Sequence, residues 1–356
     1  MGHGDRGTTR RDVLRGGAAL ATVAVAGGLM DACVTAQPPP APSASLGPPE
    51  TTTLRVPLIP PCDPWYAYCE PFLRDEGFTD LKLGTGSLSN GDADLAILYG
   101  NSFVGAVDSD TPLVALAGMH TGCIMVVARP GIATVADLRG KTVAIGTRTV
   151  PLLGKTVPST EYGFLLSLLS HIGMQPSDVN FVEVGVTGNI ITPFTDGKVD
   201  AIFVAAAAGP VLMADPKNPG HVILDSSKDK PWSQNYCCVL VTSRDWYSAH
   251  PIAAKRMTRA ILRATDAAKK DLRAAAKLTA EKQTYKATPA VTEQVLYDTI
   301  KDESFDWREY DPDDTVRFFA LRLADAKLVT KTPQRILTDG ADFAYFRQLR
   351  KELPRE

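Results

Sequence analysis

The chain has 356 residues, of which 44% are hydrophobic and 22% charged, and this composition excludes an intrinsically disordered protein. Its formal net charge of -2 gives no electrostatic basis for binding nucleic acid. The length predicts about two domains, and no stretch beyond residue 33 is apolar enough to span a bilayer.

The first segment of the chain is predicted to be an export signal. Thr9–Arg15 carries the adjacent arginines of a twin-arginine motif, and the apolar stretch Ala18–Met30 follows it. This stretch of 13 residues suits a signal peptide and is too short for a spanning helix. A buried N-terminal helix is the alternative, but Gly27-Gly28 would weaken it. Residues 1–33 are therefore assigned to a twin-arginine, lipoprotein-type signal.

Cys33 is predicted to carry lipid. The preceding Ala32 is the small residue that lipidation requires, although Asp31 and Met30 fit the usual pattern poorly. Residues 34–53 are rich in Pro, Ala, Ser and Thr, which is the composition of an extended linker. We expect a protein of the periplasm or cell envelope, anchored to the membrane by lipid at Cys33. Ordinary cleavage near Ala32 or Ala36 is the alternative.

A strand–helix–strand pattern follows the linker. Residues 54–59 are typical of a strand, and Asp63-Pro64 is a strong helix start that leads towards Gly77. A second strand is expected at 79–83. The run Gly91–Leu98, in which Gly-x-x-Asp precedes apolar residues, closes the pattern.

The same order of elements returns later in the chain. A strand at 142–145, a helix from Ser159–Glu161 to Gly173 and a strand at 180–184 lead to the run Gly197–Val204. The two Gly-x-x-Asp runs begin at residues 91 and 197, which are 106 residues apart. The pattern predicts an α/β fold of two similar lobes, with sheets covered on both faces.

Two further apolar strands, at 122–128 and 236–241, flank the second lobe. We predict that they cross between the lobes and form a hinge, with residues 54–125 plus 239–356 as lobe one and 126–238 as lobe two. Because crossing strands commonly run side by side, Cys123 is expected near Cys237 or Cys238. From about Trp246 the pattern is helical, most clearly in the Ala-rich stretch 252–276, and these helices are assigned to the outside of lobe one.

The cysteines after the signal segment offer no recognisable site. They are five in number, so at least one thiol stays unpaired in a monomer. Cys62 and Cys69 would lie roughly 10 Å apart along a helix, beyond the reach of a disulfide. Their spacing matches no common zinc signature, and neither a metal nor a cofactor is predicted. The five are Cys62, Cys69, Cys123, Cys237 and Cys238.

Several segments resemble the NitT/TauT group of ABC-transporter substrate-binding proteins, which bind nitrate, taurine, alkanesulfonates or pyrimidine precursors. The resemblance covers roughly residues 54–350 and implies a two-lobed periplasmic-binding-protein fold of type II, with two crossing strands at the hinge and a helical C-terminal extension on lobe one. It implies an ABC permease and its ATPase as partners. The loop 146–158 departs from the group because it is longer than usual. The segments are Glu70–Asp80, Asp137–Ile145, Phe194–Ala201, Lys230–Gln234 and Tyr310–Phe318.

Ligands of open α/β sheets bind beyond the carboxyl ends of the strands, and this rule nominates the candidate site. The helix start at Ser159 offers free N–H groups, while aromatic rings can stack on a ligand and amides or hydroxyls can hydrogen-bond to it. The structural alternatives are helix capping, core packing and turn formation. The ligand-binding candidates are Trp65, Tyr66, Asn101, Ser102, His120, Ser159, Thr160, Glu161, Tyr162, Asn189, Ala206, Trp232 and Tyr236.

The nominated loops favour an organic ligand. Their cations, Arg148 and Lys155, are expected to be solvated, and Ala205–Ala208 leaves room for a partly apolar molecule. A sulfonate, carboxylate or heterocycle with one polar group near Ser159 and Thr160 would use both kinds of wall.

No catalytic residue is predicted. The chain has no Gly-x-Ser-x-Gly elbow, P-loop or zincin motif, so we expect a monomeric solute-binding protein rather than an enzyme. Two alternatives stay open. One is an envelope enzyme related to pyrimidine-precursor synthases. These enzymes have a Cys-rich iron motif, which the pair Cys237-Cys238 faintly resembles. The other is a module that presents its ligand to a receptor.

Overall fold

Two mixed lobes make up the part of the chain that the structure, a computed structural model, describes: residues 46–185, 190–205, 207–218, 220–282, 291–353 and 355. The predicted signal, Cys33 and most of the predicted linker lie outside these ranges, as do Asn189 and Ala206. The described residues belong to one unit of the chain, which runs from Ala44 to Glu356.

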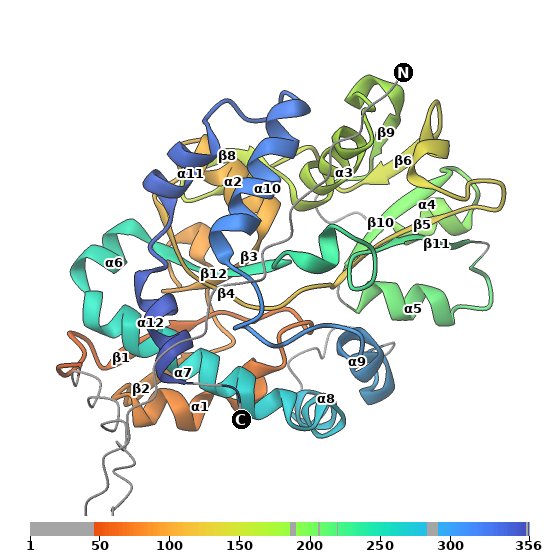
Figure 1. The fold of residues 1–356 in the computed structure, drawn as a ribbon. Helices are drawn as coiled ribbons and strands as arrows, with labels where there is room; N and C mark the ends of the chain where they lie inside the picture. Colours follow the sequence, from red (N-terminus) through yellow and green to blue (C-terminus); the bar gives the residue numbers. More distant parts are fainter. Residues whose placement is uncertain are drawn as a thin grey trace, which may run out of the picture. The chain divides into compact units, whose positions relative to one another are not determined.

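The first lobe contains two small sheets (Figure 1). In one, β1 (Thr53–Val56) pairs in parallel with β2 (Asp80–Leu83), and helix α1 (Trp65–Asp75) connects them. In the other, β12 (Cys238–Ser243) lies antiparallel between β3 (Ala96–Tyr99) and β4 (Leu113–Gly118). Helix α2 (Gly100–Asp108) follows β3 directly. The predicted strand–helix–strand order is confirmed.

The start of α1 differs from its prediction by one residue. The helix begins at Trp65 with Pro64 as its N-cap, and no side chain caps it. The Asp63 carboxylate instead accepts a hydrogen bond from the Trp65 indole N–H at 3.0 Å. Gly77 ends the helical segment as predicted, because its φ of +98° belongs to the left-handed region that glycine adopts freely.

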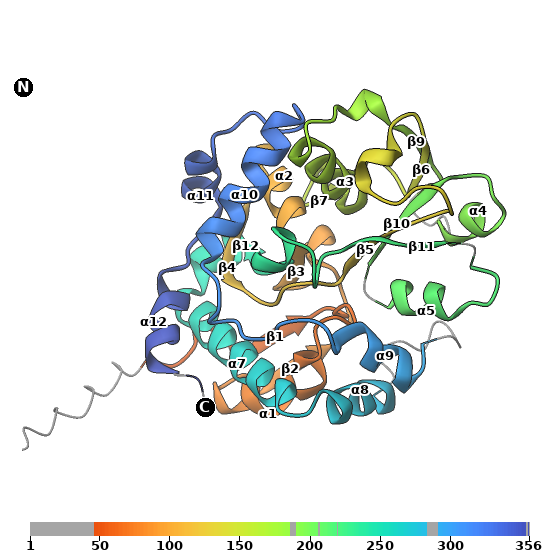
Figure 2. The same cartoon turned by 45° about the vertical axis from the view of Figure 1, so that its right-hand side comes forward.

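The second lobe is built on a five-stranded sheet with the order β11-β5-β10-β6-β9. In Figure 2, β5 runs between β10 and β11, and it is antiparallel to both of these neighbours. Helices α3 (Thr160–His171), α4 (Ile191–Thr195) and α5 (Ala208–Ala214) complete the lobe. The strands are β5 (Ile124–Ala128), β6 (Thr142–Ile145), β9 (Asn180–Glu183), β10 (Ala201–Ala205) and β11 (His221–Asp225).

The segment 146–158, predicted as a long loop, contains a β-hairpin. Strand β7 (Thr149–Leu152) pairs antiparallel with β8 (Lys155–Pro158). Leu153 and Gly154 form the two-residue turn with φ values of +47° and +75°. Two positive φ values are the mark of the turns that match the twist of a hairpin. The prediction missed the hairpin because Leu153 is not a residue that normally signals such a turn.

The chain passes between the lobes twice, after β4 and before β12. The expected proximity of Cys123 to Cys237 is confirmed, since their sulfur atoms lie 2.6 Å apart. The reason given for it is wrong, because β5 and β12 belong to different sheets and do not pair. The two cysteines meet because each lies at the crossing, immediately before its strand: Cys123 before β5 and Cys237 before β12.

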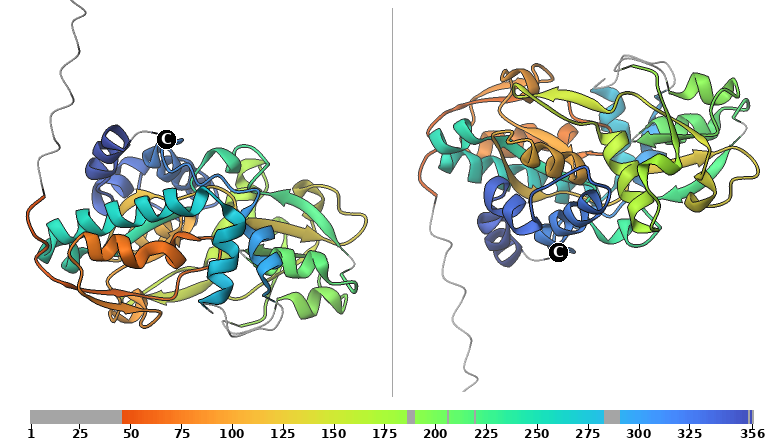
Figure 3. Two further views of the ribbon diagram at one scale, coloured as in Figure 1. Left: turned by 90° about the horizontal axis from the view of Figure 1, so that it is seen from below. Right: turned by 90° about the horizontal axis from the view of Figure 1, so that it is seen from above.

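The C-terminal helices cover lobe one, as the predicted fold class requires. Helix α7 lies along α1, and Figure 3 shows the two side by side. The predicted Ala-rich helix is two helices, because the Asp271 side chain caps a new start by accepting from the N–H of Ala274. Helices α9 and α10 also contact α5 and α3 of lobe two. The helices are α6 (Arg244–Ala249), α7 (Pro251–Lys269), α8 (Leu272–Glu281), α9 (Glu293–Ile300), α10 (Pro312–Asp325), α11 (Pro333–Gly340) and α12 (Ala344–Glu352).

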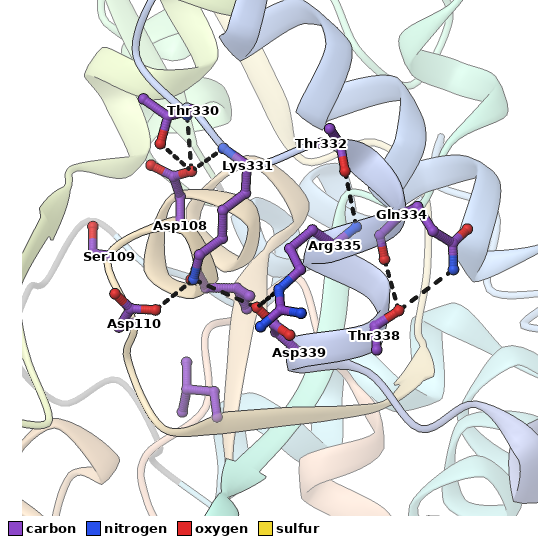
Figure 4. A network of polar contacts seen from close by, with 12 residues as sticks. Asp108, Ser109, Asp110, Thr330, Lys331, Thr332, Gln334, Arg335, Thr338 and Asp339 are labelled. Carbon is purple, nitrogen blue, oxygen red and sulfur yellow. Dashed lines mark hydrogen bonds and ion pairs between the residues drawn. The ribbon is translucent and has the colours of Figure 1, made fainter.

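Polar contacts hold these helices on lobe one. In Figure 4 the Asp108 carboxylate, at the end of α2, accepts from the backbone N–H groups of Thr330 and Lys331 just before α11. The Lys331 ammonium reaches the Val107 carbonyl and the Asp110 carboxylate, both at 2.6 Å. None of the helices in the described ranges is long and apolar enough to cross a membrane.

Candidate ligand-binding site

The N-terminal ends of α2 and α3 meet where the two lobes touch. The Asn101 side-chain amide donates to the Thr160 carbonyl at 3.0 Å, and the hydroxyls of Ser102 and Thr160 lie 2.8 Å apart. Gly163 makes this approach possible, because a Cβ there would stand 2.8 Å from the Asn101 amide nitrogen. The structure thus brings together three predicted ligand contacts, but they hydrogen-bond to one another.

Ser159 acts as the cap of α3. Its hydroxyl oxygen accepts from the N–H of Tyr162 at 3.3 Å and donates to the Thr147 carbonyl. The structural alternative of helix capping is therefore confirmed at this position. The start of α3, which was expected to meet a ligand, is in contact with Asn101 and Ser102 of α2.

Glu161 and Tyr162 lie apart from this junction. A guanidinium N–H of Arg148 donates to the Tyr162 hydroxyl at 3.2 Å, and the same guanidinium pairs with Glu183 at 3.0 Å. The Tyr162 ring also packs edge-on against Phe181. The carboxylate of Glu161 lies near Gly146. Arg148, expected to be a solvated cation, is exposed, and it also pairs with the exposed Glu183.

A small recess, with room for about one water molecule, lies beside the junction and carries two unpartnered polar atoms. The side-chain oxygen of Asn101 and the indole nitrogen of Trp232 are both buried and have no hydrogen-bond partner in the described structure. An unmet buried donor or acceptor costs about 1–3 kcal/mol, so such atoms are commonly reserved for a ligand or water. The recess is lined by Asn101, Gly122, Ile124, Phe164, Ser226, Trp232, Asn235, Tyr236, Cys237 and Phe319.

Aromatic rings form the apolar side of the recess. Trp232, in a short 3-10 helix (Trp232–Gln234), has its ring 6.3 Å from that of Phe164 and 5.0 Å from that of His171. Phe164 is also 6.4 Å from Phe319. An apolar wall with one donor and one acceptor is the usual construction of a small-molecule site.

Tyr236 lines the recess with its ring, but its hydroxyl is already bound. The phenol donates to the Trp307 carbonyl at 2.6 Å and lies 2.8 Å from the Tyr310 carbonyl. Burial raises the pKa of this phenol. A Cβ on Gly118 would stand only 2.3 Å from the ring, so the ring position is fixed by close packing.

Trp65 and Tyr66 are absent from the residues that line this recess. Trp65 is 1% exposed, and the Tyr66 ring meets it edge-on at 6.0 Å. Burial raises the pKa of Tyr66 to about 12. The structural alternative considered for these aromatics, core packing, describes Trp65.

His120 lies in a second polar cluster. Its Nδ1 is 3.1 Å from a Glu303 carboxylate oxygen, and its Nε2 is 3.4 Å from one of Asp63. Burial lowers the pKa of His120, but the two carboxylates outweigh burial and raise it well above its usual value. Burial raises the pKa of Glu303 to about 8.

Three cysteines complete this cluster and could hold a metal ion with His120. The sulfurs of Cys62, Cys123 and Cys238 and a ring nitrogen of His120 all lie within 4.8 Å of one another. Burial raises the pKa of the Cys238 thiol, but hydrogen bonds from the neighbouring thiols bring it well below its usual value. Spacing rules missed this group because its members come from three separate segments, and only His120 and Cys123 are close in sequence.

Sequence reasoning also missed two walls of the recess. Phe164 lies on α3, where nothing in the sequence pattern separates a core ring from a ring that borders a cavity. Asn235 lies between Trp232 and Tyr236, which were both candidates, so their position was a usable signal although Asn235 was not singled out.

Comparison with known proteins places the chain in a family. The family described as "NMT1/THI5 like" matches residues 80–275, more than half of the chain. No curated protein matches the sequence.

Solved structures share the fold at low identity. The periplasmic nitrate-binding protein NrtA from Synechocystis PCC 6803 superposes with a TM-score of 0.65 at 14% identity, covering 86% of this chain and 90% of that one. The alkanesulfonate-binding protein SsuA from Xanthomonas axonopodis pv. citri, bound to MOPS, gives 0.61 at 14% identity, with 83% and 99% covered. The aliphatic sulphonate binding protein SsuA from Escherichia coli gives 0.59 at 15% identity, with 80% and 91% covered. The chain has the two-lobed periplasmic-binding-protein fold and belongs to the NMT1/THI5-like family.

Proposed function

We propose that this protein is the substrate-binding component of an ABC importer, which captures a small organic solute between its lobes and delivers it to a permease. The observation that carries the proposal is the recess in which the Asn101 oxygen and the Trp232 indole N–H are buried without partners. The fold and the family support it, since similar structures are named for binding nitrate and sulfonates.

The solute is proposed to be an organic molecule with one acceptor and one donor. Its acceptor, such as a sulfonate, carboxylate or ring-carbonyl oxygen, would meet the Trp232 N–H, and its donor would meet the Asn101 oxygen. Its apolar body would lie against Phe164 and Phe319, and the recess would have to widen from its present size to admit it. The expected contact near Ser159 and Thr160 is moved to this pair, because the hydroxyls at the start of α3 already have partners.

Lobe closure is proposed to signal that the site is filled. The bonds from Asn101 and Ser102 to Thr160 cross from lobe one to lobe two, so they would form only when the lobes meet. A ligand that contacts both lobes shifts the population towards this state and presents the permease with a surface that the open state lacks.

The organisation of the chain completes the proposal. Residues 1–33 would direct export through the twin-arginine route, Cys33 would carry lipid, and residues 34–53 would form the tether. Residues 54–125 plus 239–356 would move as lobe one, and residues 126–238 as lobe two. Strand β12 belongs to the three-stranded sheet of the first lobe and begins at Cys238, and β5 belongs to the five-stranded sheet of the second lobe and begins at Ile124. Both starts lie close to the proposed limits and support them. The mature protein is proposed to act as a monomer in the envelope.

The test is a thermal-shift screen followed by calorimetry. Sulfonates, carboxylates, pyrimidines and nitrate are screened, and the compound that raises the melting temperature most is titrated into wild type and Trp232→Phe. This change keeps an aromatic ring but removes the N–H, so we expect a loss of affinity of about tenfold or more. Trp246→Phe, on α6, is the matched control and should bind like wild type.

Three outcomes would argue against the proposal or against its site. If no solute shifts the melting temperature, the binding role is not supported. If the bound compound is recovered chemically altered, the protein turns it over and the enzyme alternative is correct. Unchanged affinity in Trp232→Phe would remove the recess as the site.

A further inference from the structure

We propose that Cys62, His120, Cys123 and Cys238 form a tetrahedral binding site for a zinc ion at the crossing between the lobes. Their three sulfurs and one ring nitrogen lie within 4.8 Å of one another. Zinc bonds of about 2.3 Å to sulfur and about 2.0 Å to nitrogen place neighbouring donors roughly 3.5–3.8 Å apart in a tetrahedron. The observed group therefore needs only small side-chain movements to close on one ion.

The backbone brings these four residues together from distant parts of the chain. In the first lobe, Cys238 pairs with Tyr99 at the end of β3, and Val239 pairs with Gly118 at the end of β4. His120 follows β4 by two residues, and its carbonyl accepts from the N–H of Cys237 at 2.8 Å. The scaffold under the site is thus made of strand ends joined by hydrogen bonds.

Cys123 is held in an unusual backbone conformation. Its φ is +68°, a value that residues other than glycine rarely adopt. Such a conformation is strained, and it often persists where a functional group must be aimed in a particular direction. Here it accompanies a sulfur that lies among the other donors.

The imidazole of His120 has one ring nitrogen available for a ligand. Nδ1 lies 3.2 Å from the Thr121 carbonyl and 3.1 Å from Glu303, so it is suited to carry the proton. Nε2 is buried and makes no well-directed hydrogen bond in the described structure; the Asp63 carboxylate lies 3.4 Å away and would give way to a metal ion. A ligating histidine commonly donates its second N–H to a carboxylate or carbonyl, and this arrangement is present before any metal binds.

The donor set favours zinc among the possible ions. Thiolate sulfur selects soft or borderline ions, and three sulfurs with one nitrogen in a closed tetrahedral set are typical of structural zinc. An iron–sulfur cluster would need cysteine sulfurs farther apart, because they bind different iron atoms.

Access for a cation is provided by an acidic recess next to the cluster. Cys123 and Glu303 line a small recess together with Asp225, Asp298 and Asp302. The carboxylates would attract a divalent ion towards Cys123, the ligand that is only partly buried. Metal binding would then join Cys123, which precedes β5, to Cys62, His120 and Cys238 at the crossing.

Cys237 defines the alternative chemistry. Its sulfur lies 2.6 Å from that of Cys123, so an external oxidant could remove the two thiol hydrogens and form a disulfide between them. That bond would take Cys123 out of the ligand set, so the disulfide and the proposed metal site exclude each other.

The experiment measures metal in the full mature chain, purified from the envelope without added chelator. Elemental analysis is expected to give one zinc per chain, and replacement by Co²⁺ should give the sulfur-to-cobalt charge-transfer and strong visible bands of a tetrahedral thiolate site. Cys238→Ser should abolish the cobalt bands. Cys69→Ser is the matched control, because Cys69 is buried but lies outside the cluster.

A second variant serves if Cys238→Ser does not fold. Glu303→Gln keeps the shape of a residue that contacts His120 and should weaken zinc binding by about 10–100-fold. The proposal is overturned if the unaltered protein binds neither ion in stoichiometric amount, if thiol counting and peptide mapping find Cys123 linked to Cys237, or if Cys69→Ser loses the bands as well. Solute binding through Trp232 is measured separately, so its failure leaves this test intact.

Discussion

The junction between α2 and α3 and the cluster around His120 are both buried polar regions, but they differ in how their atoms are satisfied. At the junction, the side chains of Asn101, Ser102 and Thr160 find partners in one another across the lobes. In the cluster, the His120 ring lies between the carboxylates of Glu303 and Asp63 at 3.1 Å and 3.4 Å, but its Nε2 and the Glu303 oxygens make no well-directed hydrogen bond in the described structure. Polar groups that fully satisfy one another fix a structure, whereas groups whose hydrogen bonding is incomplete indicate a site for something the chain alone does not supply.

The largest effect is expected in a third polar region, which is fully paired. Glu76 is 4% exposed in its side chain and pairs with Arg256 at 3.2 Å and Arg259 at 2.6 Å, which ties α1 to α7. Glu76→Ala would leave both guanidinium groups without their carboxylate, and we expect a loss of about 3 kcal/mol in the free energy of unfolding.

Urea denaturation checks this prediction, with Glu70→Ala as control. Glu70 also lies on α1 and pairs with Arg74 at 2.8 Å, but that pair is exposed. Its loss should cost less than about 1 kcal/mol. Equal effects of the two changes would mean that pairing in a buried site carries no special weight in this fold.

A smaller effect is expected from Gly163→Ala at the junction. The added Cβ would stand 2.8 Å from the Asn101 amide nitrogen, so α2 and α3 would have to move apart. Overpacking of this kind costs about 1–3 kcal/mol and should also weaken solute binding. Calorimetry and thermal unfolding measure the two effects. Gly146→Ala is the control, because the nearest atom to its Cβ is 3.6 Å away; a loss of the same size there would show that the junction is not special.

The smallest effect concerns pH and the unpaired cluster. The folded-state pKa of Glu303 is about 8, above its usual 4.5, so between these values the folded protein binds more protons than the unfolded one. Stability is therefore lost as pH rises through this window. In metal-free protein, Glu303→Gln should remove part of this loss, on the order of 1 kcal/mol between about pH 5 and pH 8.

Other groups that face Glu303 titrate as well, so the comparison must be made between the two proteins. The raised pKa values of His120 and Asp63 act in the same direction, and the lowered pKa of Cys238 acts in the opposite one. Urea midpoints at the two pH values measure the difference. Identical pH dependence in wild type and Glu303→Gln would show that this carboxyl does not titrate differently on folding.

The sequence predicted the lobes because their signals are local. Strand patterns, the Ser159 cap and Gly77 each depend on a few neighbouring residues, and the structure has them close to the expected positions. Asp271 is a similar local signal, but the continuous Ala-rich pattern on both sides concealed the break between α7 and α8.

The site was harder to predict because its chemistry depends on distant residues. Whether Asn101 is a turn residue or a ligand contact depends on Thr160, which lies 59 residues away in the chain. The cluster needs Cys62 and Cys238 to meet, and no spacing rule covers such a separation. Only the argument from the two crossings, which placed Cys123 near Cys237, pointed towards it.

The β7–β8 hairpin fastens the second lobe to the first. From the second lobe it reaches the first, where the N–H of Leu153 donates to the Ser89 carbonyl at 3.2 Å and Pro158 packs on Gly105. These contacts must be broken whenever the lobes separate. If the protein captures a solute between its lobes as proposed, the hairpin would lengthen the time for which the solute stays inside, independently of how well the recess fits it. Shortening the hairpin would then make exchange faster without changing which solute is chosen.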